Sequence, residues 1–497
     1  MKTIPLWIGG KAVAAAATRN APVTNPSTGA VSAQVPLCDA ADIDRAVQSA
    51  RAAYAGWRDT PPVRRARVLQ QFLQLLQANQ KELARLASEE HGKTLPDAMG
   101  SVQRGIEVVE FACGIPHLLK GEYAASVGTG VDVHTLRQPL GVCVGITPFN
   151  FPAMVPLWMF PMAIACGNTF ILKPSEKVPS CSMKMAELFT AAGLPDGVLN
   201  VVHGDKVAVD ALIAHADVAA VSFVGSTPIA RTIYETCAKH GKRVQALGGA
   251  KNHAVVMPDA DIDFAAESLV GAAFGSAGER CMAISVAVAV GEVAEPLVAA
   301  IRAKAEKIPV GPSDADGVEM GPLVTAAHRD RVSGYVDKGV AEGATLVLDG
   351  RGFKVASHPD GFYLGPSLFD QVSTGMSIYR DEIFGPVLCV LRVNSLDEAM
   401  AMINANPYGN GTAIFTTSGE AARRFEQEIQ VGMVGVNVPI PVPASFFSFG
   451  GWKASLFGDL HAYGPEAVSF YTRGKVITSR WPHQESKATG LNMPTLG

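Results

Sequence analysis

Apolar residues in the first quarter of the chain recur at the spacing of a helix. Between residues 63 and 91, Gln and Arg separate a set of large apolar side chains, namely Val68, Leu69, Phe72, Leu75, Leu76, Leu83 and Leu86. This spacing places the set on one helical face. We therefore predict helices over 39–113, starting with the acidic segment Asp39 to Tyr54 and including one helix over Val63 to His91.

From residue 140 onward, short apolar runs alternate with helical stretches. The runs lie at 142–146, 169–172, 197–202, 219–224 and 243–247, and the intervening stretches lie at 153–166, 180–192, 205–215 and 226–240. Such alternation predicts a parallel sheet flanked by helices, with ligands at the carboxyl ends of the strands. A second alternating unit runs from about 253 to 438.

Two segments outside these units look like strands that lie far apart in sequence. They cover 121–138 and 467–480. A pair of exposed strands of this kind is suited to assembly with another subunit. We expect an α/β protein with three parts: 1–120 with 139–248, then 249–450, and an arm made of 121–138 and 467–480.

Composition excludes several classes of protein. The chain has 497 residues, 48% of them hydrophobic, and a net charge of −4. This length fits about three domains, and the balanced charge argues against a nucleic-acid binder. The eight cysteines form no zinc-type or disulfide pattern, so we expect no metal site and a reduced compartment.

Neither the N-terminus nor the longest apolar stretch has the pattern of a targeting or membrane segment. Gly9, Gly10 and Lys11 interrupt the first apolar run, which argues against a signal peptide. Phe151 to Cys166 contains three prolines and is too short to span a bilayer. We expect a cytoplasmic protein with no membrane partner.

Loops after the predicted strands carry residues suited to a dinucleotide. Lys173 and Glu176 follow one strand, where a carboxylate can accept hydrogen bonds from ribose hydroxyls, although solvated loop residues give the same pattern. Gly225 and Ser226 begin a helix, whose free amides suit a pyrophosphate. An ordinary capped helix is equally compatible with that sequence.

One cysteine and one asparagine stand out as candidate catalytic groups. Cys281 follows small residues and Arg280, and a nearby cation favours the reactive thiolate. Asn150 lies between two prolines after a strand, where its amide could stabilise an oxyanion. A buried cysteine and a turn asparagine are the ordinary alternatives. Glu382 and Phe384 precede another predicted strand, where Glu382 could bind a second ribose and Phe384 could pack on a flat ring. A surface carboxylate and a loop hydrophobe are the ordinary alternatives.

Together these motifs resemble the aldehyde dehydrogenase superfamily. TPFNFP, KPSE, FVGST, LGG, GERC and EIFGPV occur in this order between residues 147 and 387. The resemblance implies a Rossmann-like NAD-binding domain, an α/β catalytic domain and a small β oligomerisation arm. It implies Cys281 as nucleophile, Asn150 in the oxyanion hole, and an NAD site made of Thr147, Phe149, Lys173, Glu176, Gly225, Ser226, Leu247, Gly248, Glu382 and Phe384.

One departure from the family pattern concerns hydrolysis of the acyl-enzyme. Members that hydrolyse the thioester have Glu-Leu-Gly-Gly, whereas this chain has Ala246-Leu247-Gly248-Gly249. A methyl group cannot accept a proton from water, so the acyl group should persist until a thiol such as coenzyme A arrives. The stretches QALGGAKNH, GERCMA and VGVNVPIPVPASFFSF resemble the CoA-acylating methylmalonate-semialdehyde dehydrogenases.

That branch implies a substrate and an assembly. The expected reaction converts methylmalonate or malonate semialdehyde to propanoyl-CoA or acetyl-CoA, with Arg280 and Arg104 holding the substrate carboxylate. A homotetramer built as a dimer of dimers is expected, with a dimer as alternative. The segment FGGWKAS at 449–455 departs from the branch pattern, which leaves open which carboxylate-bearing aldehyde is the substrate. The alternative function is a hydrolytic enzyme for another acidic aldehyde, with water activated by some other residue. A non-catalytic dinucleotide-binding protein would keep the fold without the reaction.

Overall fold

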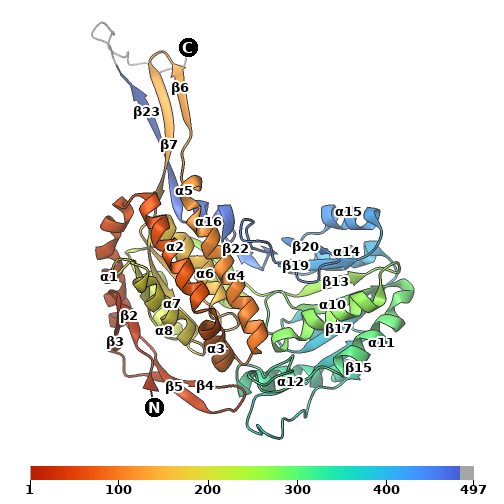
Figure 1. Cartoon of the computed structure of the whole chain (residues 1–497). Helices are drawn as coiled ribbons and strands as arrows, with labels where there is room; N and C mark the ends of the chain where they lie inside the picture. The colour runs from red at the N-terminus through yellow and green to blue at the C-terminus, as the bar shows by residue number, and fades with distance from the viewer. Residues whose placement is uncertain (1, 482–497) are drawn as a thin grey trace.

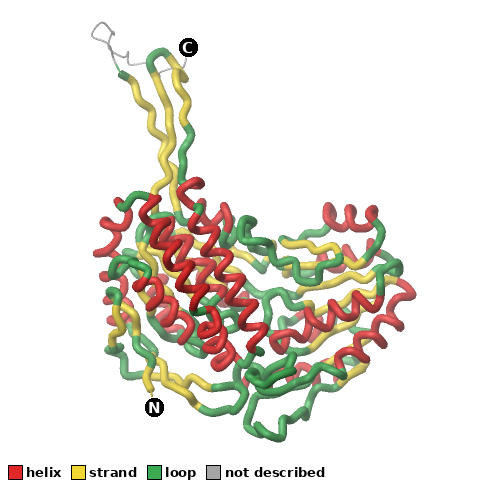
Figure 2. The backbone as a smooth tube through the Cα atoms, in the orientation of Figure 1, coloured by secondary structure: helices red, strands yellow, loops and turns green. Residues whose placement is uncertain are grey.

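The computed structural model describes residues 2–481, and Met1, which the first predicted part includes, lies outside them. Figure 1 and Figure 2 show two sheet-and-helix units side by side, with a long β arm projecting from one of them. Each unit has its own large cluster of buried apolar side chains.

The first unit is built on an eight-stranded sheet with the order β22-β12-β11-β8-β9-β10-β2-β3. Its five central strands are parallel and almost entirely buried, as their continuous apolar runs predict. These are β8 (Val142–Ile146), β9 (Thr169–Lys173), β10 (Leu199–Val201), β11 (Val218–Val224) and β12 (Arg243–Leu247). Antiparallel strands complete the edges: β2 (Leu6–Ile8), β3 (Lys11–Val13) and β22 (Leu456–Phe457).

Helices surround this sheet as the alternating pattern predicts. Those between the strands are α6 (Met154–Ala165), α7 (Ser180–Ala191), α8 (Lys206–Ala214) and α9 (Thr227–Lys239). Those from the first quarter of the chain are α1 (Ala40–Asp59), α2 (Pro62–Ala78), α3 (Gln80–His91), α4 (Leu95–Cys113) and α5 (Ile115–Leu118). The single helix predicted over 63–91 is wrong, because Asn79 ends α2 and its side-chain amide donates to the Leu75 carbonyl at 2.8 Å.

The second unit holds a seven-stranded sheet with the order β15-β16-β17-β14-β13-β19-β20. Only β15 runs antiparallel to its neighbour. The strands are β13 (Asn252–Val256), β14 (Ile284–Val290), β15 (Thr345–Leu348), β16 (Ser367–Asp370), β17 (Val387–Val393), β19 (Gly411–Phe415) and β20 (Met433–Val436). Its helices are α10 (Ile262–Phe274), α11 (Ala294–Ala305), α12 (Ala326–Ala341), α13 (Ser377–Arg380), α14 (Leu396–Ala405) and α15 (Gly419–Glu428).

The projecting arm is a three-stranded antiparallel sheet with the order β23-β7-β6. It consists of β6 (Tyr123–Gly128), β7 (Val131–Pro139) and β23 (Thr472–Arg480). The strand predicted from residue 467 begins five residues later, because Ala467–Phe470 close the short helix α16 (Gly464–Phe470). The apolar side chains of that helix pack into the first unit and do not join the arm.

Short strands form two further small sheets. A small sheet joins β1 (Lys2–Thr3), β5 (Val31–Pro36) and β4 (Asn20–Thr24), and β18 (Tyr408–Gly409) pairs with β21 (Trp452–Lys453). Two 3₁₀ turns, η1 (Gly275–Gly278) and η2 (Gly291–Val293), flank β14. Within residues 2–481, no helix is long and apolar enough to cross a membrane.

Candidate active site

Cys281 lies in a short loop between η1 and β14, and its backbone is fixed from two sides. Three successive residues before it, Ser276 to Gly278, have positive φ angles of 54°, 50° and 72°. The Cys281 carbonyl then accepts hydrogen bonds from the side-chain amides of Asn252 at 2.9 Å and Asn410 at 3.0 Å. The predicted nucleophile therefore occupies a defined position between the two units.

Gly278 brings the cysteine loop against the loop that carries Glu382 and Phe384. A Cβ atom on Gly278 would lie 2.2 Å from the Gly385 carbonyl oxygen. With its positive φ angle, this position accepts glycine alone without a backbone shift. The small residues before Cys281 thus allow two backbone segments from the second unit to touch.

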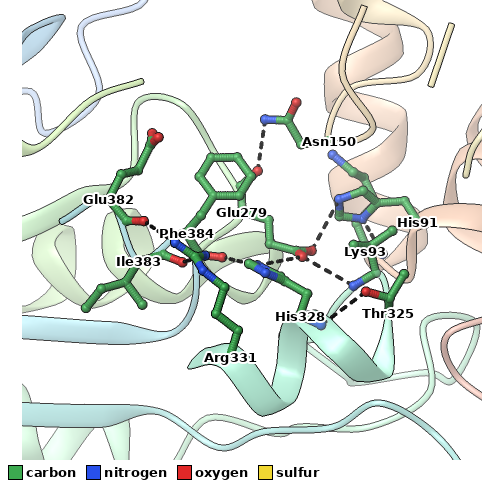
Figure 3. A network of polar contacts seen from close by, with 11 residues as sticks. His91, Lys93, Asn150, Glu279, Thr325, His328, Arg331, Glu382, Ile383 and Phe384 are labelled. Atoms are coloured by element: carbon green, nitrogen blue, oxygen red, sulfur yellow. Dashed lines mark hydrogen bonds and ion pairs between the residues drawn. The ribbon is translucent and has the colours of Figure 1, made fainter. Parts of the chain in front are cut away.

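Asn150 reaches the cysteine loop from the first unit. It is buried, and its Nδ2 donates to the Glu279 carbonyl at 3.0 Å (Figure 3). An amide nitrogen carries two hydrogens, so one N–H remains for a ligand. The asparagine that the sequence singled out is therefore adjacent to the candidate nucleophile, although 131 positions separate them in sequence.

The Glu279 carboxyl lies in a buried polar cluster. Its Oε1 accepts from the Val324 amide at 3.2 Å, and its Oε2 lies 3.4 Å from His91 Nε2. His328 Nε2 lies 3.5 Å from the same carboxyl and donates to the Phe384 carbonyl at 2.6 Å (Figure 3). This cluster joins the segment that holds Asn150 to the segment that holds Phe384.

Side-chain donors bind the backbone carbonyl groups of the loop over 381–384 and hold the loop in place. Lys251 Nζ donates to the Asp381 carbonyl at 2.9 Å, and Arg331 donates to the Glu382 and Ile383 carbonyls at 3.1 and 3.0 Å. With the bond from His328, four successive carbonyls have side-chain donors. Phe384 has a φ of 59°, which is costly for a bulky residue, and these bonds maintain it.

A cavity of about 290 Å³ opens between the loops of the two units. Eight of the predicted site residues contribute to its lining, together with Pro148, Val224, His328 and Arg331. The predicted residues are Phe149, Asn150, Gly225, Ser226, Gly248, Cys281, Glu382 and Phe384. Loops that follow β8, β11 and β12 therefore converge with the cysteine loop, as expected for the carboxyl ends of a parallel sheet.

Charges around the cavity act on the thiol in opposite directions. Burial raises the pKa of Cys281 to about 12, the Glu382 carboxylate adds to the increase, and the Lys93 ammonium opposes it. Burial also raises the pKa of Glu382 to about 7. The prediction that Arg280 is the cation acting on the thiol is wrong, because its guanidinium pairs with Asp97 at 2.7 Å.

Two predicted cofactor residues lie at the end of β9, outside the cavity lining. Lys173 is buried and donates to the Gly204 carbonyl at 2.9 Å, while its Nζ lies 3.9 Å from Glu176 Oε2. The Glu176 side chain is one-third exposed. Thr147 and Leu247 are buried beside the lining residues, and the Thr147 hydroxyl has no hydrogen-bond partner among the described residues.

The two predicted substrate arginines occupy different surroundings. Arg280 lines a small cavity of about 20 Å³ together with Cys281 and Glu382. Arg104, on α4, donates to the Glu107 carboxylate and to the Pro443 carbonyl, both at 2.6 Å. The Tyr463 hydroxyl donates to the same carbonyl at 3.1 Å. Arg104 therefore belongs to a second polar group beside the 440–447 loop and does not line the cavity with Cys281.

Several residues of the site carried no recognisable signal in the sequence. His328 and Arg331 occupy one face of α12, three residues apart, and that spacing is their only local indication. His91 is the last residue of α3 and Lys93 follows that helix; both are buried, as is Glu279. Lone histidines and lysines are most often ordinary structural or surface residues, so only the fold shows that these meet.

Ala246 lies in β12 with its side chain fully buried, two residues before Gly248 of the cavity. It packs in an apolar cluster with Ile146 and Phe223. Among the described residues, Glu382 is the one carboxylate that lines the cavity with Cys281.

Comparisons with known proteins agree with this arrangement. The aldehyde dehydrogenase family model matches residues 13–477. The malonate-semialdehyde dehydrogenase of Pseudomonas aeruginosa is 61% identical, with 100% of both chains covered. The malonate-semialdehyde dehydrogenase of Halalkalibacterium halodurans is 52% identical, over 96% of this chain and 98% of its own.

Solved structures give the same result for the fold. The methylmalonate-semialdehyde dehydrogenase of Oceanimonas doudoroffii superposes with a TM-score of 0.96 at 56% identity, covering 97% of this chain and 99% of its own. A Sinorhizobium meliloti protein assigned to the same activity and solved with NAD has a TM-score of 0.96 at 53% identity, covering 98% and 99%. The predicted α/β fold is confirmed, and the chain belongs to the aldehyde dehydrogenase family.

Proposed function

We propose that this chain oxidises malonate or methylmalonate semialdehyde with NAD through a thioester on Cys281, and that coenzyme A takes the acyl group. The substrate carboxylate leaves as CO2, so the products are acetyl-CoA or propanoyl-CoA. The observation that carries the proposal is Ala246, which stands where hydrolytic relatives have their base, in a site that keeps the thiol and the amide. Relatives named for these semialdehydes match over the full length.

The residues around the cavity suit NAD. Ser226 precedes α9, and its side chain does not cap that helix, so the first amides are free for a pyrophosphate. Gly225 lines the cavity nearby, and Glu382 and Phe384 line the end beside Cys281. We assign the adenosine ribose to Lys173 and Glu176. When bound, NAD supplies the acceptor for the aldehyde hydride.

Within this site, the chain's own groups perform the acyl chemistry. The Cys281 sulfur attacks the aldehyde carbon, and the free N–H of Asn150, with the Cys281 backbone amide, stabilises the oxyanion. Loss of hydride leaves a thioester. The Glu279 carboxyl lies against His91 and accepts from the Val324 amide, and position 246, where hydrolytic relatives have their base, carries a methyl group. The thioester therefore persists until a thiol attacks it.

Ala246→Glu is expected to increase CoA-independent release of free acid by about 10²-fold, because a carboxylate at this position can activate water. The measurement is the rate of acid formation from the acyl-enzyme without CoA. Ala246→Gln is the matched control, since it introduces the same bulk without a base and should leave that rate unchanged. Equal rates in both variants would remove Ala246 from the explanation.

Replacing Arg280 or Arg104 by leucine is expected to raise KM for a semialdehyde about ten- to hundredfold and to leave KM for propanal nearly unchanged. The size follows from losing a charge-assisted hydrogen bond to the substrate carboxylate. Arg280→Lys keeps a cation near Asp97 and separates loss of the binding fork from loss of the ion pair. Parallel increases for both aldehydes would indicate a general structural effect.

We also infer a homotetramer built as a dimer of dimers through the β arm. The two edge strands of the arm are β6 and β23, and Tyr123 and Val476 on them are 65% and 68% exposed. Exposed apolar side chains on an open edge favour pairing with another copy. Light scattering on the full chain distinguishes the tetramer from the dimer.

The proposed function is tested by analysing products with each semialdehyde in the presence and absence of CoA. We expect acetyl-CoA from malonate semialdehyde, propanoyl-CoA from methylmalonate semialdehyde, and CO2 from both. Rapid formation of free acid without CoA would favour a hydrolytic enzyme for another acidic aldehyde. No NADH with any aldehyde would favour a non-catalytic dinucleotide-binding protein.

A further inference from the structure

The cavity that contains Cys281 also contains three other ionisable side chains, His328, Arg331 and Glu382. If the proposed function holds, a thiol must lose its proton in this cavity before it can attack the thioester. A free thiol has a pKa of about 8.5 and is mostly protonated at neutral pH. The question is therefore which side chain of the cavity can take that proton.

Two of the three candidates are unsuited to this task. Arg331 stays protonated in proteins, and its guanidinium is already used by the Glu382 and Ile383 carbonyls. His328 donates through Nε2 to the Phe384 carbonyl, and burial lowers its pKa to about 4. A group with so low a pKa is a weak base at neutral pH.

Glu382 has the position and the free atom that a proton acceptor needs. Its Oε1 accepts from the Ala250 amide at 2.9 Å, which leaves Oε2 without a bond from the described residues. It lines both cavities that contain Cys281, and Figure 3 shows it on the opposite side of the Phe384 ring from Asn150. Its carboxylate is also the charge with the largest effect on the pKa of the thiol.

From this shared cavity we propose that Glu382 is the catalytic base that deprotonates the attacking thiol of coenzyme A. The Glu382 carboxylate takes the proton from the S–H group. The thiolate sulfur then bonds to the thioester carbon, the bond from that carbon to the Cys281 sulfur breaks, and Cys281 leaves as a thiolate. The proton on Glu382 passes to this thiolate, which restores both groups.

Glu382 also belongs to the proposed NAD site, and the two roles fall in successive steps of the cycle. The cavity of about 290 Å³ lies at the lower limit for small-molecule sites, so the nicotinamide and the thiol arm occupy it in turn. Burial raises the pKa of Glu382 to about 7, close to the operating pH that suits a general base. The ionisable groups that influence or surround it are Lys251, Cys281, His328, Arg331, Tyr408 and the adjacent Asp381.

The test separates acyl transfer from the NAD-dependent step. Acyl-enzyme is prepared from p-nitrophenyl propanoate without NAD, and a single turnover with CoA is followed from pH 5.5 to 9. For the wild type we expect the rate to rise through a pKa of about 7, where Glu382 becomes ionised. For Glu382→Gln we expect a rate about 10²-fold lower at pH 7 and a pH profile moved toward the ionisation of the thiol itself.

An acidic thiol distinguishes a base from a structural residue. Thionitrobenzoate is already ionised at pH 7, so it should accept the acyl group equally fast from the wild type and from Glu382→Gln. Asp381→Asn is the matched control, because it neutralises the neighbouring carboxylate, which binds the Tyr335 hydroxyl outside the cavity. That variant should transfer to CoA like the wild type.

The outcomes are distinct. Equal CoA transfer by the wild type and Glu382→Gln would overturn this inference, as would a Glu382→Gln enzyme that is slow with both thiols. A wild-type acyl-enzyme that ignores CoA and hydrolyses would instead overturn the proposed function.

Discussion

Cys281→Ala is expected to reduce NADH formation from any aldehyde by about 10⁴-fold or more, since the substitution removes the atom that forms the covalent intermediate. The fold should remain intact, because the Cys281 backbone carbonyl keeps its bonds to Asn252 and Asn410. NAD binding should therefore survive the substitution. The measurements are steady-state NADH formation and binding of NAD by calorimetry.

Cys113→Ala is the matched control for this substitution. Cys113 ends α4, is also partly buried, and lies outside both cavities lined by Cys281. It should retain wild-type activity. Residual aldehyde oxidation by Cys281→Ala within tenfold of the wild type would contradict the assignment of the nucleophile.

Asn150→Ala is expected to lower kcat about 10²- to 10³-fold, which is the usual cost of removing one oxyanion donor. KM should change less, because the oxyanion exists only after the thiol has attacked. The substitution also leaves the Glu279 carbonyl without its donor, which is expected to cost about 1–3 kcal/mol of stability. The measurements are kcat and KM for propanal together with the thermal unfolding midpoint.

Asn150→Asp provides the sharper comparison. It keeps the size of the side chain, removes the N–H donors and adds a negative charge where the oxyanion would form. We expect it to be at least as inactive as Asn150→Ala. Activity of Asn150→Asp close to that of the wild type would show that the amide has no electrostatic role.

Periodicity was sufficient to predict the large elements of the fold. The continuous apolar runs of β8, β9 and β11 are buried strands of a parallel sheet, and the segments between them are helices. Periodicity failed where a local bond decided the structure. Asn79 ends α2 within an unbroken apolar stripe, and residues 467–470 are helical because they pack into the first unit.

The candidate site was predictable only where its residues lie in recognisable motifs. Asn150, Cys281 and Glu382 do, and they line one cavity. Lys93, His91 and His328 do not, because their positions relative to Cys281 depend on packing between α3, α12 and the cysteine loop. The pKa of the Cys281 thiol illustrates the difference. Arg280 is adjacent to Cys281 in sequence but is paired with Asp97, whereas Lys93, far away in sequence, is the cation that lowers the pKa of the thiol.

Because Ala246 leaves no carboxylate at the position where hydrolytic relatives have their base, the thioester on Cys281 should outlast the redox step. Rapid mixing of enzyme, NAD and malonate semialdehyde without CoA tests this expectation. We expect a burst of about one NADH per active site, then near arrest, and renewed turnover when CoA is added. Linear NADH production without CoA, with matching release of free acid, would contradict it.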